Sequence, residues 1–236
     1  MIVVAYYSLG TPYEHEARLL QASLERVGMR HRIKGYADAG DWYANTAIKP
    51  EAIREARRAV SGPMLYVDVD AFVHAKCDAY FENLGAQGMD FGVHWFAGPA
   101  GGHRKNDVCA CLAGQRCNRQ HRLLSGTLFF GDTDGARHLL DTWIALNATL
   151  RERRLVEGGG QKNLWFLTTC MKDLRVASLP GRYCYVFDKA WAYPHDEPRI
   201  IEHTIASRDN RAQRRQTSPR SNRKRQLMNL IQTRPT

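Results

Sequence analysis

The sequence has no run of about 18 or more apolar residues, so no segment is expected to span a membrane. Residues 1–6 also lack the basic start and long apolar core of a signal peptide, and they are typical of a strand instead. The six cysteines are scattered, and no secretion signal precedes them. Reduced thiols in a cytoplasmic protein are therefore expected.

Acidic residues are nearly missing from the C-terminal region. Residues 208–236 hold nine basic side chains and one acidic side chain, which is +8 of the net +10, so residues 1–207 are nearly neutral at +2. We divide the chain into a domain, 1–208, and a basic tail, 209–236, that is flexible or helical. The tail predicts a polyanionic partner, nucleic acid rather than membrane, because it has no long apolar face. A disordered tail that only aids solubility is the alternative.

Hydrophobic residues make up 44% of the 236 positions, which suffices for the core of one α/β domain. Strand-like and helix-like segments alternate in the first half of the chain, which predicts a mostly parallel, doubly wound α/β sheet with helices on both faces. Strands are expected at about 2–7, 32–36, 64–70, 91–95, 124–132, 175–179, 183–187 and 200–203. Helices are expected at about 12–27, 49–60, 136–150 and 161–171.

Two carboxylates, Asp68 and Asp70, end the apolar run that starts at Met64. On an extended backbone they would point to the same side, because side chains alternate with a period of two. Two neighbouring carboxylates repel each other unless a cation lies between them, and a hard divalent ion that also binds phosphate oxygens suits this place. The pattern therefore predicts a metal–diphosphate site. A solvated acidic turn is the alternative.

A long segment, residues 98–122, is rich in Gly, Cys, His and Arg. It contains Cys109, Cys111 and Cys117, whose spacing is not one of the strong zinc patterns. Structural zinc is one interpretation. A basic loop with free thiols that binds the acceptor is favoured, because loops of this length within a compact domain are usually functional or disordered.

An ordered set of motifs resembles the nucleotide-diphospho-sugar glycosyltransferases of the GT-A fold. The motifs are Thr11-Pro12-Tyr13-Glu14 after the first strand, Lys49-Pro50, residues 66–70, residues 125–130, the glycines before Gln161, Leu179-Pro180 with residues 183–188, and residues 201–208. The set spans about residues 1–208. The small size and basic tail are most similar to phage-encoded members, some of which glycosylate modified bases in DNA.

The resemblance implies a Mn²⁺ or Mg²⁺ ion and a UDP-sugar or another nucleoside-diphosphate sugar as donor. Asp68, Asp70 and His203 would bind the metal, and Asp68 would contact the metal or the ribose. Lys49 and Arg208 would neutralise the diphosphate. Thr11 would hold the base and ribose.

The catalytic groups are less completely specified. Gln161 stands where a related retaining family has an acid on either side, and here Gly160 and Lys162 replace those acids. An inverting enzyme needs a carboxylate base, for which Asp188 is the candidate, with Asp132 and Glu157 as weaker ones. The expected acceptor-binding residues are Trp95, Ser125, Gly126, Thr127, Arg214 and Arg215.

Other classes fit the sequence less well. The motif at residues 67–72 also resembles the first metal motif of translesion DNA polymerases, and an Asp-x-Asp pair occurs in haloacid-type phosphatases, but the second acidic pair that both need does not follow. A non-enzymatic nucleic-acid-binding module would explain the tail and leave the two aspartates unexplained. A glycosyltransferase that acts on a glycan or lipopolysaccharide is the further alternative.

Overall fold

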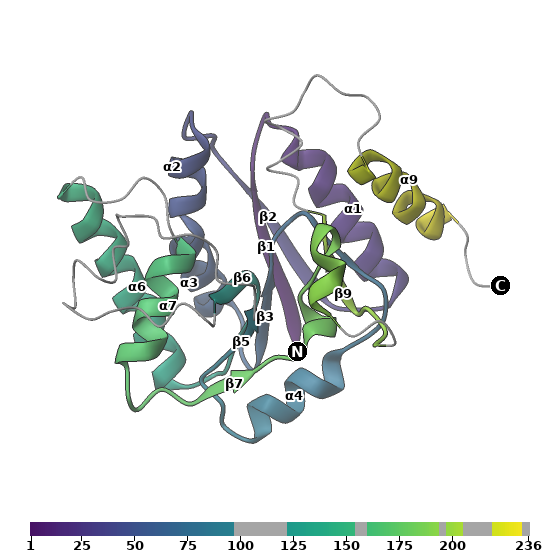
Figure 1. Cartoon of the computed structure of the whole chain (residues 1–236). Coiled ribbons are helices and arrows are strands. Elements are labelled where there is room, and N and C mark those ends of the chain that lie inside the picture. The colour runs from purple at the N-terminus through teal and green to yellow at the C-terminus, as the bar shows by residue number, and fades with distance from the viewer. Residues whose placement is uncertain (97–121, 154–159, 194–196, 205–218, 233–236) are drawn as a thin grey trace.

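A six-stranded sheet in the order β2-β1-β3-β6-β5-β7 forms the centre of the protein (Figure 1). The computed structural model describes residues 1–96, 122–153, 160–193, 197–204 and 219–232. The strands of this sheet are β1 (Ile2–Ser8), β2 (His31–Tyr36), β3 (Met64–Val67), β5 (Phe91–Phe96), β6 (Arg122–Phe130) and β7 (Val176–Ser178). Three of its five neighbouring pairs are parallel, and β6 runs antiparallel to both of its neighbours.

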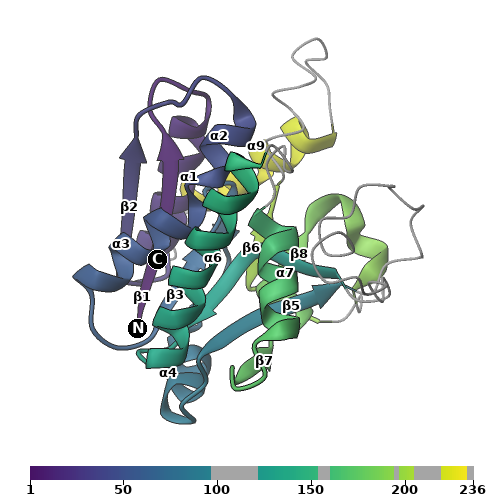
Figure 2. The same ribbon diagram turned by 90° about the vertical axis from the view of Figure 1, so that its left-hand side faces the viewer.

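Helices cover both faces of the sheet, as the helices on either side of the strands in Figure 1 show, and Figure 2 looks onto one of these faces. They are α1 (Tyr13–Arg26) and α4 (Asp78–Ala86) on one face and α3 (Lys49–Ala59), α6 (Asp134–Glu152) and α7 (Gly160–Cys170) on the other. Strand β3 supplies both cores, since Leu65 and Val67 pack with α1 and α4 while Met64 and Tyr66 pack with α6 and α7. This two-sided burial explains why β3 is an unbroken apolar run.

A second, three-stranded sheet has the order β4-β9-β8 and lies next to the carboxyl end of β3. Its strands are β4 (Ala71–Val73), β8 (Tyr185–Val186) and β9 (Ile201–His203), and two 3₁₀ segments, η1 (Gly181–Tyr183) and η2 (Phe187–Ala192), flank β8. Strands β4 and β9 pair antiparallel, with Ala71 opposite His203. This register places His203 beside the chain segment that carries Asp70.

Two further helices complete the described structure. The short α2 (Trp42–Ala47) precedes α3, and α9 (Pro219–Gln232) packs beside α1 (Figure 1). No helix in these ranges is both long enough and apolar enough to cross a bilayer.

The predicted fold class is confirmed, because the α/β domain has a mixed, mostly parallel sheet with helices on both faces. One detail of the prediction was wrong, because the backbone is not extended through Asp68 and Asp70. Instead it turns at residues 69–70, with Ala71 N–H donating to the Asp68 carbonyl at 3.0 Å. Residues 98–121 lie outside the described ranges, so zinc binding and acceptor binding by that segment stay predictions.

Candidate active site

A pocket of about 300 Å³ opens at the carboxyl ends of β1 and β3. In open α/β sheets, ligands bind at this edge. Five of the residues singled out from the sequence line this pocket, namely Lys49, Asp68, Asp70, Ser125 and Gln161. Its aromatic wall consists of Tyr6, Tyr7, Tyr13, Trp42 and Tyr66.

Lys49 and Asp68 form an ion pair on the pocket floor. Lys49 is the first residue of α3, and its Nζ donates to Asp68 Oδ1 at 2.7 Å and to the Ser125 carbonyl at 3.2 Å. The Tyr66 hydroxyl also donates to Asp68 Oδ1, at 2.7 Å. Asp68 Oδ2 makes no hydrogen bond with the described residues, so only one oxygen of this carboxylate is held by them.

His203 is buried next to Asp70. Its Nε2 lies 2.8 Å from the Thr127 hydroxyl, and its Nδ1 lies 3.8 Å from Asp70 Oδ1. The Nδ1 atom has no hydrogen-bond partner in the described part of the chain. Gly126 lies directly against the ring, since a Cβ at this position would lie 2.9 Å from His203 Cε1. The absence of a side chain at Gly126 therefore permits the observed ring position.

The charge state of His203 depends on its neighbours. Burial lowers the pKa of the imidazole, but the Asp70 carboxylate and Cys184 outweigh burial and raise the pKa to about 10. Without a metal, a protonated His203 therefore pairs with Asp70.

The side chains around His203 fit a hard divalent cation. Nowhere in the described ranges do three His, Cys, Asp or Glu side chains form a ready-made cluster. A buried Nδ1 without a partner and a carboxylate 3.8 Å away are nevertheless suitable ligands for an ion that also takes phosphate oxygens and water. When the Nε2–H donates to the Thr127 hydroxyl, the tautomer is fixed with its Nδ1 lone pair free for a metal.

Gln161 reaches the pocket from the first turn of α7. Its Oε1 accepts from the Ser125 backbone N–H at 3.3 Å and from the Ser125 hydroxyl at 3.4 Å. Ser125 also lies within 3.4 Å of Lys49 Nζ through its hydroxyl. Gln161, Ser125, Lys49 and Asp68 thus form one connected polar network along one side of the pocket.

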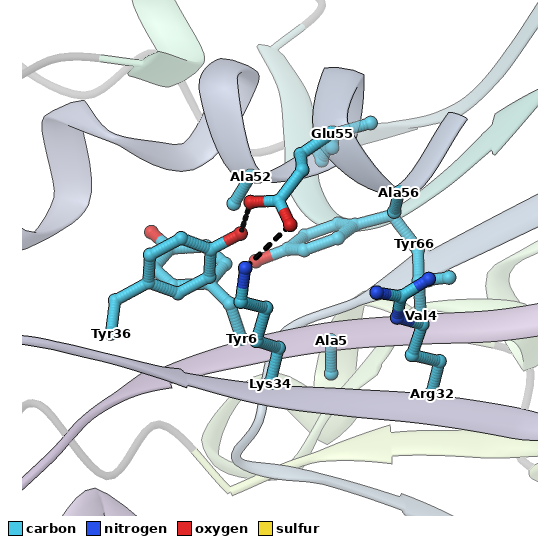
Figure 3. Close-up of a pocket in the computed structure, with 11 residues that line it drawn as sticks. Val4, Ala5, Tyr6, Arg32, Lys34, Tyr36, Ala52, Glu55, Ala56 and Tyr66 are labelled. Carbon is cyan, nitrogen blue, oxygen red and sulfur yellow. Dashed lines mark hydrogen bonds and ion pairs between the residues drawn. The ribbon is translucent and has the colours of Figure 1, made fainter. Parts of the chain in front are cut away.

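A smaller hollow, with room for about one water molecule, lies between β1, β2 and α3 (Figure 3). Tyr6 and Tyr66 line both this hollow and the larger pocket, and their rings stack at 6.1 Å. In Figure 3, Lys34 and Tyr36 both reach Glu55 across the hollow. The exposed Lys34–Glu55–Tyr36 network lines this hollow, and the two tyrosines separate it from the larger pocket.

Other residues predicted from the sequence lie away from the pocket lining. The Thr11 hydroxyl donates to the Ser8 carbonyl at 2.6 Å and so shapes the turn between β1 and α1. Trp95 packs in the core formed with α6 and α7, and Asp188 is exposed on η2. Residues Arg208, Arg214, Arg215 and Glu157 lie outside the described ranges.

Asp132 was a wrong candidate for the base. It follows β6, whose antiparallel register places Phe130 opposite Met64 and Thr127 opposite Val67. Asp132 is therefore at the opposite end of β3 from Asp68, where it accepts hydrogen bonds from the Gly62 N–H and Arg137.

Sequence reasoning missed the aromatic wall. Tyr66 precedes Asp68 by two residues in a strand, and this spacing was a usable signal that both side chains face the pocket. Trp42 lies on α2, and no side chain of this helix is buried. The sequence around Trp42 is polar, so no helix or strand was predicted there.

Neither a protein-family model nor a curated protein matches the sequence. Solved structures do match the fold of this chain. A glycosyltransferase involved in glycosylation of the major capsid of PBCV-1 superposes with a TM-score of 0.61 at 14% identity, covering 90% of this chain and 98% of that one. The galactosyltransferase LgtC, solved with donor and acceptor sugar analogues, gives 0.53 at 12% identity with 86% of each chain covered.

The chain has the GT-A fold. The glycosyltransferase GlyE of Streptococcus pneumoniae TIGR4 shares it, with a TM-score of 0.55 and 18% identity, over 86% of this chain and 54% of that one. At such identities the likeness establishes the GT-A fold, and the reaction has to be argued from the pocket of this GT-A domain itself.

Proposed function

We propose that this GT-A protein is a metal-dependent glycosyltransferase that moves a sugar from a nucleoside-diphosphate donor, such as a UDP-sugar, to an acceptor hydroxyl. One observation carries the proposal. Asp70 lines a pocket with aromatic walls, and its Oδ1 lies 3.8 Å from the Nδ1 of buried His203, for which the described residues provide no hydrogen-bond partner. The carboxylate and the imidazole nitrogen are suited to the metal ion, a basic side chain is suited to the diphosphate, and the aromatic wall is suited to the nucleobase of such a donor.

The donor would lie along the pocket with its base toward the aromatic wall. Tyr13 and Trp42 line the pocket there, and an aromatic ring can stack on any nucleobase. Lys49 carries the positive charge nearest Asp68, and it would bind the diphosphate together with Arg208. Thr11 would act through the turn that places Ser8 and Tyr13 at the pocket.

Asp68, Asp70 and His203 would hold Mn²⁺ or Mg²⁺. The ion, when bound, stabilises the negative charge that develops on the leaving diphosphate. Thr127 orients the His203 ring, and Tyr66 and Lys49 orient Asp68.

For the sugar-transfer step we propose Gln161 as a contact of the donor sugar, because its side chain lines the pocket next to Ser125. Asp188 is the proposed base for an inverting reaction. Because Asp188 does not line the donor pocket, Asp188→Asn is expected to leave the affinity for the donor unchanged and to lower the rate of transfer to an acceptor. Equal transfer rates in both proteins would remove Asp188 from the mechanism.

For the acceptor we propose a polyanion, DNA with a modified base first, on the basis of the tail charge alone. Two tail cations, Arg223 and Lys224, pair with carboxylates of the domain, so the test uses Arg214→Ala/Arg215→Ala instead of tail deletion. This variant should weaken use of DNA and flatten its salt dependence while donor hydrolysis stays unchanged. Transfer to a glycan or protein acceptor with no response to salt would redirect the acceptor to that class.

Donor hydrolysis tests the function itself. Release of nucleoside diphosphate from a panel of nucleotide sugars should require Mn²⁺ or Mg²⁺, stop with EDTA and fall by at least about a hundredfold in Asp70→Asn. Asp141→Asn is a matched control, because Asp141 is an exposed aspartate that does not line the pocket. No hydrolysis of any donor, together with salt-sensitive DNA binding, would instead support a binding module.

A further inference from the structure

Two buried carboxylates of the GT-A domain are paired with neighbouring cations of the C-terminal helix α9. Glu202, in the centre of β9, is fully buried, and Arg223 donates to both of its oxygens, from Nε at 2.7 Å and from Nη2 at 2.6 Å. Lys224 pairs with Glu16 of α1, whose side chain is 7% exposed. Leu227, one turn further along α9, is also buried. The helix is therefore fitted to the domain by charge and by packing.

Glu202 is adjacent to His203 in the chain, and successive side chains in a strand point to opposite faces. The Glu202 carboxylate thus points toward α9 while the His203 ring points toward Thr127 and Asp70. The same carboxylate also lies 2.8 Å from Nε2 of His74, which follows β4. A bidentate pair of this kind fixes both the position and the orientation of the carboxylate.

The position of β9 determines the position of both proposed metal ligands. His203 lies on β9 itself, and Thr204, the next residue, donates from its backbone N–H to the Asp70 carbonyl at 3.0 Å. The Thr204 hydroxyl donates to the same carbonyl at 3.1 Å. A displacement of this three-residue strand would therefore move the imidazole of His203 and the backbone of Asp70 together.

We propose that Arg223 of α9 is a positioning residue for the metal site, acting through Glu202 and β9 on His203 and Asp70. The inference rests on the proposed function, since it concerns the cation that the nucleotide donor would share. It assigns the C-terminal helix a role in the donor site that is separate from any binding of an acceptor by the tail.

Binding of Mn²⁺ in the presence of UDP, measured by electron paramagnetic resonance of the free ion, tests the proposal without any turnover. Arg223→Gln should weaken Mn²⁺ binding by about tenfold, as expected when the outer partner of a ligand is lost. Arg223→Lys, which keeps the charge and one donor, should restore part of the affinity. Glu202→Gln should weaken binding similarly, and the double variant should be no worse than either single variant.

Leu227→Ala is the matched control for docking of the helix. It removes packing between α9 and the domain without touching Glu202, so it should lower the melting temperature and leave Mn²⁺ affinity unchanged. Equal losses of affinity in Arg223→Gln and Leu227→Ala would show that docking alone matters and would overturn the proposal. Unchanged affinity in Arg223→Gln would do the same. If the unaltered protein binds no Mn²⁺ with UDP, the proposed function fails first, and the inference fails with it.

Discussion

At the scale of single residues, Lys49 would compete with the proposed divalent cation for the Asp68 carboxylate. The ammonium group lies 2.7 Å from Asp68, where it neutralises charge that a metal would otherwise share. A nucleotide donor changes this balance, because its phosphates offer Lys49 a second anion. The order in which metal and nucleotide bind should therefore depend on this lysine.

Lys49→Gln is expected to raise the affinity for Mn²⁺ alone and to lower the affinity for UDP with Mn²⁺, each by about three- to tenfold, because one positive charge is lost beside Asp68. Isothermal titration with each ligand measures both effects. Lys34→Gln, which breaks the exposed pair with Glu55 in the smaller hollow, should change neither. A loss of affinity for both ligands in Lys49→Gln would contradict competition.

Gly126→Ala is expected to weaken Mn²⁺ binding, because the added Cβ would lie 2.9 Å from the His203 ring and would displace it. The loss of stability should be about 1–3 kcal/mol in the unaltered background. In a His203→Ala background the same substitution should cost little, since the ring is gone. Urea unfolding of the four proteins gives the coupling between the two positions, and purely additive effects would refute the contact.

At the scale of elements, the helices and strands that were predicted from the sequence have a clear hydrophobic periodicity and bury that face against a neighbouring element. Strand β3 and helix α6 bury long apolar faces, so their patterns were visible. Helix α2 buries no side chain, α4 has a weak apolar stripe, and β4 has three residues, so no local signal marked them. The turn at residues 69–70 was missed because it depends on β4 pairing with the distant β9.

The candidate site, like the fold, was predictable from the sequence only where a local motif marks the residues. Asp68, Asp70, Lys49 and Gln161 were found from motifs, and the structure brings all four into one pocket. Gly126 was expected to contact the acceptor, but it lies against His203, a contact between positions 77 residues apart that no local pattern encodes.

Asp90 links three elements and should make stability depend on pH. It follows α4 and accepts a hydrogen bond from the Arg175 backbone N–H before β7 at 2.8 Å. Burial alone would raise the pKa of Asp90. Three hydrogen bonds outweigh burial and lower the pKa: one from the Arg175 backbone, one from the Thr133 hydroxyl at the start of α6 and one from the Arg175 side chain. Its contribution to stability is therefore present above about pH 4, the unfolded value, and is lost as the pH falls through the folded pKa.

Asp90→Asn is expected to lower the free energy of unfolding by about 1–2 kcal/mol at pH 7, because a buried, charge-assisted network is weakened. The difference between the two proteins should shrink as the pH falls from about 5 to 3. Urea unfolding at several pH values measures this, with the exposed Asp141→Asn as a control expected to stay near the unaltered protein. A difference that grows toward acid pH would contradict the assigned sign.

At the scale of the whole molecule, α9 behaves as part of the domain although its sequence belongs to the basic tail. Burial raises the pKa of Glu202, yet hydrogen bonds from Arg223 and His74 outweigh it and lower the pKa to about 2, so the carboxylate is ionised at neutral pH. Removal of α9 would leave Glu202 buried without its main partner, and it would expose the surface that Leu227 covers.

Deletion of residues 219–236 is therefore expected to lower the free energy of unfolding by about 3–5 kcal/mol, as for the loss of one partner from a buried ion pair. Urea unfolding of the shortened chain measures the loss. Arg225→Ala, which changes an exposed cation on the same helix, should have almost no effect. A shortened chain as stable as the full chain would show that α9 is not part of the folded domain.

The central claim is that Asp70 and His203 hold a divalent cation that binds the diphosphate of a nucleotide donor. The most direct test is the melting temperature of the protein with UDP, with Mn²⁺, and with both. We predict that UDP raises the melting temperature only when Mn²⁺ is present and that Asp70→Asn abolishes this rise. An equal rise with UDP and EDTA, or an undiminished rise in Asp70→Asn, would contradict the account.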